Sequence, residues 1–280
     1  MTFKLRLRGV ALSLTLLLSI NSLTSTAHAD SFEAFFGEQD GLFAISKKRD
    51  KTFMDAGITY MNRAPFVGSE ETENLVLPFV RADYKGRLFI SPALGAGVYW
   101  RNTDKMRVST SLNFATGRDE DDTPLIGESG EVDSSLVVTN TVRFYVPFAA
   151  FDAISTVPFT GDFEGARLDA LLTTEVKPIK GLRITPGVRA SFGTSGWINS
   201  LYEIETSDLA TLDQVDLQPF RANRGLMALG FHTAAYYELP NDFQLIGVVN
   251  YSALQNDAAD SPLSVDNSGL TLAIGLARHF

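Results

Sequence analysis

Two histidines and one acidic run are the residues of this chain whose types suit catalysis or metal binding. Past the first thirty positions the histidines are His232 and His279. Serine-type catalysis needs a histidine within hydrogen-bond reach of a nucleophile and usually a third, orienting group. His232 stands beside Thr233 with no serine in register on the same predicted strand, and His279 is the penultimate residue. We therefore predict no catalytic residues and a protein that is not an enzyme.

The acidic run Asp119-Glu120-Asp121-Asp122 offers several carboxylates but no recognisable ligand spacing. It lacks the alternating ligands, central Gly and distal Glu of an EF-hand. The chain has no cysteine, which excludes disulfides and cysteine-ligated metals. With no phosphate loop, dinucleotide fingerprint or zinc spacing either, we predict no metal and no cofactor. A weak contact with Ca²⁺ or Mg²⁺, or bridging to lipopolysaccharide through such ions, stays open.

Residues 1–29 have the three-part pattern of a secretory signal peptide. Three basic residues precede an apolar run at 10–20, and Ala27-His28-Ala29 forms an A-x-A cleavage site. The apolar run is about half of the roughly 20 residues that span a bilayer as a helix. We expect the mature chain to begin at Asp30.

The charge of the chain excludes nucleic acid as a partner. The formal net charge is −9, and removal of the signal peptide takes away three basic residues and no acidic ones, which makes it −12. Binding to phosphate backbones needs a cationic surface instead. No window after residue 30 is long and apolar enough for a membrane-spanning helix, so a mature protein in a membrane must be a closed barrel.

Apolar and polar residues alternate with period two along most of the mature sequence, which predicts strands. The alternating segments are longer than the five or six residues usual in soluble strands. We predict an all-β fold, an antiparallel transmembrane β-barrel over residues 51–280, with residues 30–50 as a periplasmic or plug segment. The candidate strands are 52–62, 74–84, 87–100, 104–115, 134–146, 149–158, 166–177, 181–192, 197–207, 224–238, 242–254 and 268–280. These are about twelve, and loss of the two weakest, 149–158 and 197–207, would leave ten.

The last strand has the pattern of a closing strand of an outer-membrane barrel. Leu270, Leu272, Ile274 and Leu276 form one apolar face that leads to the terminal Phe280. With the signal peptide, this predicts the outer membrane of a Gram-negative bacterium. Eight aromatic residues fall near predicted strand ends and are expected to form girdles: Tyr60, Tyr84, Trp100, Tyr145, Trp197, Tyr236, Tyr237 and Phe280.

Charged residues opposite the apolar rows are expected to line the barrel lumen. A charge that faces lipid at mid-bilayer costs about 2–4 kcal/mol, so several cannot point outward. The predicted lumen residues are Arg107, Arg143, Asp169, Glu175, Arg183, Arg189 and His232. Strand parity places the connection 117–133 on the periplasmic side, where its Arg118, Asp119, Glu120, Asp121 and Asp122 are candidates for a polar partner contact.

Several short blocks of the sequence, in order, resemble the MipA/OmpV family. They are Gly57-Ile58-Thr59-Tyr60 through Gly68-Ser69-Glu70-Glu71, Leu77-Pro78-Phe79-Val80, Tyr84-Lys85-Gly86-Arg87-Leu88-Phe89, Gly117 to Asp122 with Pro124-Leu125, and Asp257 to Leu263. They span nearly the whole mature chain. The ending Ala277-Arg278-His279-Phe280 departs from the commoner Tyr-Arg-Phe of the family.

This resemblance implies an envelope scaffold. The expected partners are a lytic transglycosylase and a peptidoglycan synthase beneath the membrane, besides outer-membrane lipid and lipopolysaccharide. The polar lumen face alone fits a passive, porin-like channel for small solutes instead. A surface adhesin is the third possibility.

Overall fold

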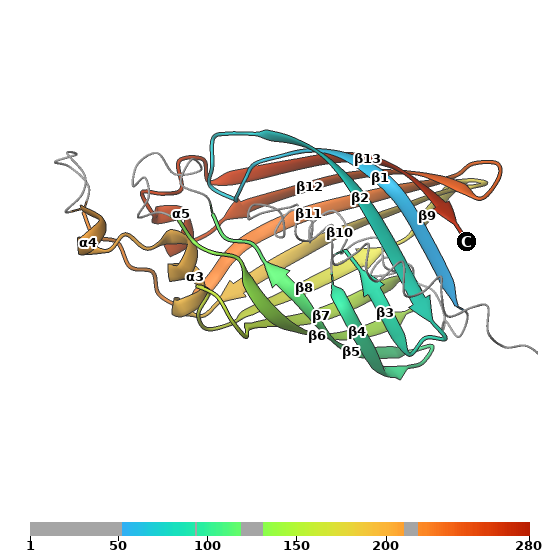
Figure 1. Cartoon of the computed structure of the whole chain (residues 1–280), viewed down its shortest axis with the longest axis horizontal. Helices are drawn as coiled ribbons and strands as arrows, with labels where there is room; N and C mark the ends of the chain where they lie inside the picture. The colour runs from blue at the N-terminus through green and yellow to red at the C-terminus, as the bar shows by residue number, and fades with distance from the viewer. Residues whose placement is uncertain (1–51, 93, 119–130, 210–217) are drawn as a thin grey trace, which may run out of the picture.

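One antiparallel sheet whose two edges meet forms the wall of the molecule (Figure 1). The computed structural model describes residues 52–92, 94–118, 131–209 and 218–280. Apart from β8 and β9, which both pair with β10, each strand pairs with its neighbour in the chain, and β13 returns to pair with β1. At the β1–β13 seam Asp55 lies opposite His279, and Asp55 Oδ1 is 2.6 Å from His279 Nδ1.

The wall contains twelve strand positions, because β8 and β9 follow one another along β10 and together fill one place. The strands are β1 (Phe53–Arg63), β2 (Glu73–Tyr84), β3 (Leu88–Ser91), β4 (Gly95–Asn102), β5 (Met106–Ala115), β6 (Ser135–Val146), β7 (Ala149–Pro158), β8 (Arg167–Thr174), β9 (Val176–Ile179), β10 (Leu182–Gly193), β11 (Gly225–Glu238), β12 (Phe243–Leu254) and β13 (Ser268–His279). The predicted closed barrel of about twelve antiparallel strands is confirmed.

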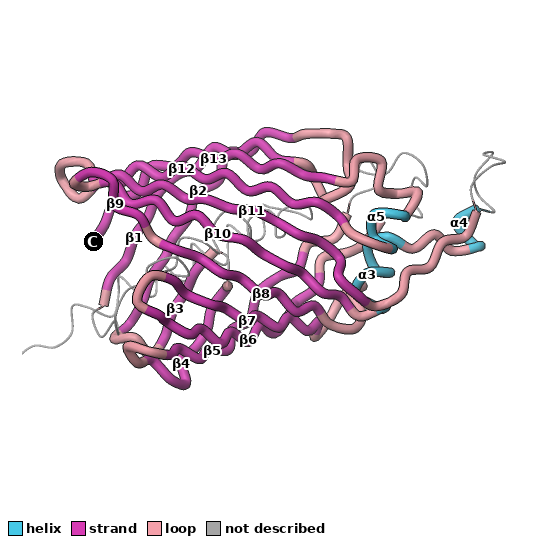
Figure 2. The backbone as a smooth tube through the Cα atoms, turned by 180° about the vertical axis from the view of Figure 1, so that it is seen from behind, coloured by secondary structure: helices cyan, strands magenta, loops and turns pink. Residues whose placement is uncertain are grey.

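In the described part of the chain, three helices gather at one end of the barrel (Figure 2). They are α3 (Ser195–Tyr202), α4 (Thr206–Leu209) and α5 (Asp257–Asp260). None of the helices in the described part of the chain has the length and apolar character needed to cross a membrane.

Two of the predicted strands, 87–100 and 197–207, were wrong. The first is two strands and the second is none, so the predicted number of strands is still correct. Residues 87–100 form a hairpin of β3 and β4 rather than one strand, because Ser91 Oγ accepts a hydrogen bond from Leu94 N at 3.0 Å and Gly95 has φ +72°. The predicted strand 197–207 is wrong as well, since this stretch begins with α3. An early pair of short strands thus replaces one strand, and a helix replaces another.

Because residues 87–100 form two strands, the connection 117–133 lies at the end of the barrel opposite the C-terminus. Its predicted periplasmic placement is therefore wrong. An extra hairpin upstream reverses the direction of β5, whose last residues now lead to the end that carries α3. Arg118 and Val132 form an isolated bridge there, and the Arg118 guanidinium donates to the Leu201 carbonyl of α3. We call this end the long-loop end; it holds the connections after β1, β5, β7, β10 and β12. The other, with the brief turns and the C-terminus, is the short-turn end (Figure 1).

The turns at the short-turn end rely on residues that accept a positive φ. Lys85 and Gly86 have φ values of 53° and 60°, and Asn241 and Asp242 have 61° and 62°. Left-handed backbone of this kind is favourable for Gly and tolerated by Asn and Asp. The tight turns let consecutive strands pair directly, as the antiparallel wall requires.

Side chains alternate between an apolar outer surface and a polar interior. Along β13, Leu270, Leu272, Ile274 and Leu276 are exposed on the outside, whereas Thr271 and Ala273 are buried inside. The same inversion occurs on β5 and β6, where Leu112 and Phe144 face outward and the buried polar residues face inward, among them Ser109, Ser111, Thr139 and Thr141. Large apolar side chains on the outside and polar ones inside are the pattern of a barrel in lipid.

An apolar cluster nevertheless covers one side of the interior. It comes from strands β1–β3 and β11–β13 and contains, among others, Met61, Leu77, Phe79, Phe89, Tyr236, Ile246 and Val248. The prediction that eight aromatic residues form girdles is therefore only partly correct. Tyr60, Tyr84, Trp100, Tyr237 and Phe280 are exposed, whereas Tyr236 and Trp197 are buried and Tyr145 is half-buried on the inner face, so these last three are not girdle residues.

Candidate functional site

Helix α3 is fixed at the long-loop end by its N-cap residue, Thr194, and by its apolar side chains. The Thr194 hydroxyl accepts hydrogen bonds from Trp197 N at 3.4 Å and from Ala166 N at 2.9 Å. It thereby satisfies one of the free N–H groups at the start of the helix. Trp197 is 0% exposed, and its ring lies 4.8 Å from the ring of Phe163. The helix is therefore part of the barrel's packed interior.

Four separate connections of the barrel make hydrogen bonds to α3. Tyr202 Oη donates to Val67 O at 2.8 Å, and Arg118 donates to Leu201 O. Glu164 N donates to Ser200 Oγ at 3.0 Å, and Ser261 Oγ donates to Tyr202 O at 2.8 Å. These partners follow β1, β5, β7 and β12, respectively. We call α3 with these four contacts the α3 cap.

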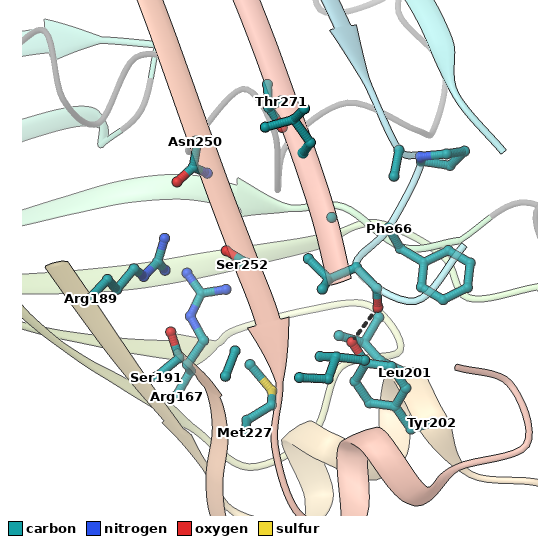
Figure 3. Close-up of a pocket in the computed structure, with 17 residues that line it drawn as sticks. Phe66, Arg167, Arg189, Ser191, Leu201, Tyr202, Met227, Asn250, Ser252 and Thr271 are labelled. Carbon is teal, nitrogen blue, oxygen red and sulfur yellow. Dashed lines mark hydrogen bonds between the residues drawn. The ribbon is translucent and has the colours of Figure 1, made fainter. Parts of the chain in front are cut away.

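A cavity of about 90 Å³ lies under the α3 cap, between it and the inner wall (Figure 3). Its wall is polar and carries Ser191 from β10, Asn250 and Ser252 from β12, and Thr271 from β13. Its roof is apolar and consists mainly of Phe66, Val67, Leu201 and Met227. Arg167 and Arg189 are the charged side chains among its described lining residues. The cavity thus combines two cations, neutral hydrogen-bonding groups and an apolar cover.

The two arginines of the cavity share one buried carboxylate. Arg167 Nε is 2.9 Å from Asp169 Oδ2, and Arg189 Nε and Nη2 lie 3.1 and 2.9 Å from Asp169 Oδ1. Asp169 is buried, whereas Arg189 keeps part of its surface exposed. Arg167 also lies over the Trp197 ring, 5.2 Å from its centroid. Asp169 therefore holds both guanidinium groups beside the cavity, and Figure 3 shows both reaching into it.

Two further predicted lumen residues lie in a second charged group on β5–β7. Arg143 is buried and pairs with Asp152, and Arg107 lies over the rings of Tyr99 and Tyr145 at 5.0 and 5.9 Å. The structure does not bring this group to the cavity lining.

The remaining predicted lumen residues are spread along the barrel. His232 is buried and its Nε2 is 3.3 Å from Thr173 Oγ1, so its ring contacts the inner wall of β8. Arg183 lies over the Tyr236 ring at 4.5 Å. Glu175 pairs with the exposed Lys177 at 2.8 Å near the short-turn end. The cavity therefore unites Arg189 with Arg167 around Asp169, and it leaves the other predicted residues apart.

The residues predicted for a partner contact are mostly outside the described residues. Asp119, Glu120, Asp121 and Asp122 all fall in the segment 119–130. Arg118 is described and is buried beneath α3, with its guanidinium over the Phe66 ring at 6.0 Å. Its side chain is used inside the α3 cap.

Sequence reasoning missed several residues of the site, and for some of them a signal existed. Arg167 stands two positions before Asp169, so the same period-two rule that placed Asp169 inside would have placed Arg167 there. Asp152 lies on β7, a strand with a weak alternation. Asn250 and Ser252 are neutral and carry no distinguishing pattern. Their role depends on the register that brings β12 under α3.

Within the described ranges, no group of three or more His, Asp or Glu side chains is placed to hold a metal ion. A closed antiparallel wall, apolar outside and polar inside, with brief turns at one end and longer connections at the other, defines an outer-membrane β-barrel protein. Residues 56–280 match the family model described as MltA-interacting protein MipA, and the chain belongs to this family.

Solved barrels are similar to the chain only remotely. Neisserial surface protein A is 10% identical with a TM-score of 0.26, and 82% of this chain and 97% of that chain are covered. The NanC porin is 12% identical with a TM-score of 0.33, covering 80% and 98%. The translocator domain of the autotransporter NalP from Neisseria meningitidis is 10% identical with a TM-score of 0.34, covering 87% and 92%. A search of curated proteins finds no match. The class of the protein therefore rests on its own wall and on the family match.

Proposed function

We propose that this protein is a non-catalytic scaffold that holds a lytic transglycosylase, and with it a peptidoglycan synthase, beneath the outer membrane. The description of its family names an interaction with MltA. A scaffold needs an accessible docking surface on the side of its partners, and brief turns of outer-membrane barrels face the periplasm. The short-turn end is therefore the surface to consider.

The observation that carries the proposal is a basic patch at the short-turn end of an otherwise acidic protein. Exposed Lys85 and Arg87 on the β2–β3 turn lie beside exposed Arg101 and Lys105 around the β4–β5 turn. The two turns are in contact, because Asn102 Nδ2 donates to Gly86 O at 3.2 Å. We call these four residues the basic rim. The exposed Asp104 lies between Arg101 and Lys105, but the four basic side chains leave the rim net positive and suited to an anionic protein surface.

The long-loop end has the opposite character. Its exposed charged residues include the acidic Glu70, Glu71, Asp162, Glu164 and Asp266. Opposite charges at the two ends of one barrel give each end a different class of partner, because like-charge contacts cost free energy. A partner steered by the basic rim would approach from the periplasm only.

Charge reversal at the basic rim tests the proposal. The triple variant Lys85→Glu, Arg87→Glu, Lys105→Glu should still form a heat-modifiable barrel but lose most co-purification of lytic transglycosylase activity from cross-linked envelopes. The matched control, Glu70→Lys with Glu71→Lys, changes charge at the other end and should keep it. Raised salt should weaken the wild-type contact as well. Equal recovery of the enzyme with the triple variant would overturn the proposal.

A passive porin is the second candidate, and the polar inner wall favours it. Single-channel steps of purified protein in a planar bilayer would support a porin. A silent bilayer would support the scaffold, and the α3 cap leads us to expect silence, since it ties four connections together over the long-loop end.

A further inference from the structure

The cavity under the α3 cap contains two cations that are held in place before any ligand arrives. Asp169 fixes Nε of both Arg167 and Arg189, together with Nη2 of Arg189. Arg189 has its other Nη nitrogen left over, because no further acceptor for Arg189 is found among the described residues. A guanidinium is planar and matches the two oxygens of a carboxylate. Pre-set guanidinium groups therefore lose little side-chain entropy when they bind such an anion.

The wall beside Arg189 leaves space for a ligand. Arg189 lies in register with Gly230 of β11, which pairs with Ser252 of β12. A Cβ at position 230 would sit 3.3 Å from Ser252 Oγ and 3.8 Å from Arg189 Cβ, so a larger residue there would narrow the site. Asn250 and Thr271 add an amide and a hydroxyl to the same wall. The neutral donors can complete the hydrogen bonds of an oxyanion without adding charge.

The roof limits what the anion can be attached to. Phe66, Leu201 and Met227 present carbon and sulfur atoms toward the cavity. A few water molecules or one small solute fill about 90 Å³, since about 10–15 Å³ of such volume is enough for one water. A ligand with a short hydrocarbon body and one anionic group uses both the roof and the arginines.

We propose that the cavity between Arg167, Arg189 and the α3 cap binds the carboxylate of a small organic acid. The carboxylate lies against the guanidinium groups, and its alkyl body lies under the apolar roof. This proposal is independent of the scaffold role, because the basic rim is at the other end of the barrel.

Trp197 provides a direct reporter, because its ring contacts Arg167. The chain has one other tryptophan, Trp100, which is exposed on the outer surface. In a refolded Trp100→Phe protein the fluorescence therefore comes from Trp197. Sodium butyrate should change this fluorescence saturably at constant ionic strength. Uncharged butyramide, and sodium chloride at the same concentration, should not. Sodium sulfate should bind more weakly than butyrate.

Two variants locate the binding in the cavity. Arg189→Met should weaken butyrate at least about tenfold, whereas Arg183→Met, another inward arginine outside the cavity, should not. Ser252→Leu fills the cavity and keeps both arginines, so it should also abolish the fluorescence response to butyrate. If Arg189→Met does not fold, this variant alone tests whether butyrate binds in the cavity. No saturable change with butyrate, equal binding by Ser252→Leu, or sulfate binding as tight as butyrate would each overturn the proposal.

Discussion

Arg143 of β6 and Asp152 of β7 face each other inside the barrel and form a two-point ion pair. They are register partners across the two strands. Arg143 Nε lies 2.6 Å from Asp152 Oδ1, and Arg143 Nη2 lies 2.7 Å from Asp152 Oδ2. The side chains are 2% and 0% exposed. Each charge is compensated mainly by the other, because bulk water reaches neither.

Removal of one partner of this pair should destabilise the barrel strongly. Asp152→Asn leaves the Arg143 charge buried with less compensation, which typically costs about 3–5 kcal/mol. The double variant Arg143→Met, Asp152→Leu should cost less than the single one. Urea unfolding of protein refolded in vesicles measures both. As a control, Lys177→Met breaks a pair whose lysine is 68% exposed and should cost no more than about 1 kcal/mol. A single variant as stable as wild type would contradict the expectation.

Gly57→Ala should impair closure of the barrel at the β1–β13 seam. An added Cβ would lie 2.3 Å from Leu276 O and 2.7 Å from a ring carbon of Phe79, so either the seam or the ring must move. Overpacking of this kind costs about 1–3 kcal/mol. Gly247→Ala is the control, since no atom lies within 4 Å of the added carbon. The heat-modifiable fraction after refolding should fall for the first variant and stay unchanged for the second.

Trp197→Ala should open the long-loop end to ions. Truncation of a fully buried aromatic side chain costs about 3–5 kcal/mol, and here the loss falls on the α3 cap. Current steps should then appear in planar bilayers, where we expect none from the wild type. Trp100→Ala, on the outer surface, should leave the conductance unchanged. If both variants were silent, α3 would not be what closes this end.

The link between Asn223 and Asp257 at the long-loop end should resist acid. The main-chain N and Nδ2 of Asn223 donate to Asp257 Oδ2 at 2.7 and 2.9 Å, and these bonds hold the pKa of the Asp257 carboxyl below its usual value of 3.8. A lowered pKa means that the link is present at neutral pH and is lost only as the pH falls through that lowered value. The amide shift of Asn223, followed by NMR during acid titration, should change at a lower pH than expected for an aspartate with the usual pKa of 3.8. In Asp257→Asn this change should disappear.

The sequence predicted the barrel because its main signal, period-two alternation, is local. The same signal failed at α3, where Trp197, Ile198, Leu201 and Tyr202 place large residues densely enough to pass for a strand. The helix depends on its N-cap residue Thr194 and on packing of Trp197 against Phe163, which is remote in sequence. The β3–β4 hairpin failed for the reverse reason. A tight turn at Ser91 and Gly95 interrupts an apolar stretch that alternation alone treats as continuous.

The candidate site could be predicted only in part, for a related reason. Alternation indicates which charges point inward, so Arg189 and Asp169 were within reach of the sequence. Which inward charges meet depends on strand register and on the loops that cover them. Arg167 meets Trp197 only because α3 folds back over β8, and no pattern within either segment encodes that contact.

The contacts of α3 also impose an order on assembly. Its partner Val67 lies 135 residues before Tyr202, and its partner Ser261 lies 59 residues after it. While the sheet is only partly formed, Val67, Tyr202 and Ser261 are far apart. Bringing them together at that stage would cost loop-closure entropy that no strand pairing yet offsets. These two contacts can form together only once the first and last hairpins lie side by side. This part of the stabilisation of α3 therefore forms late, when the barrel closes, and we expect it to be lost early when the barrel unfolds.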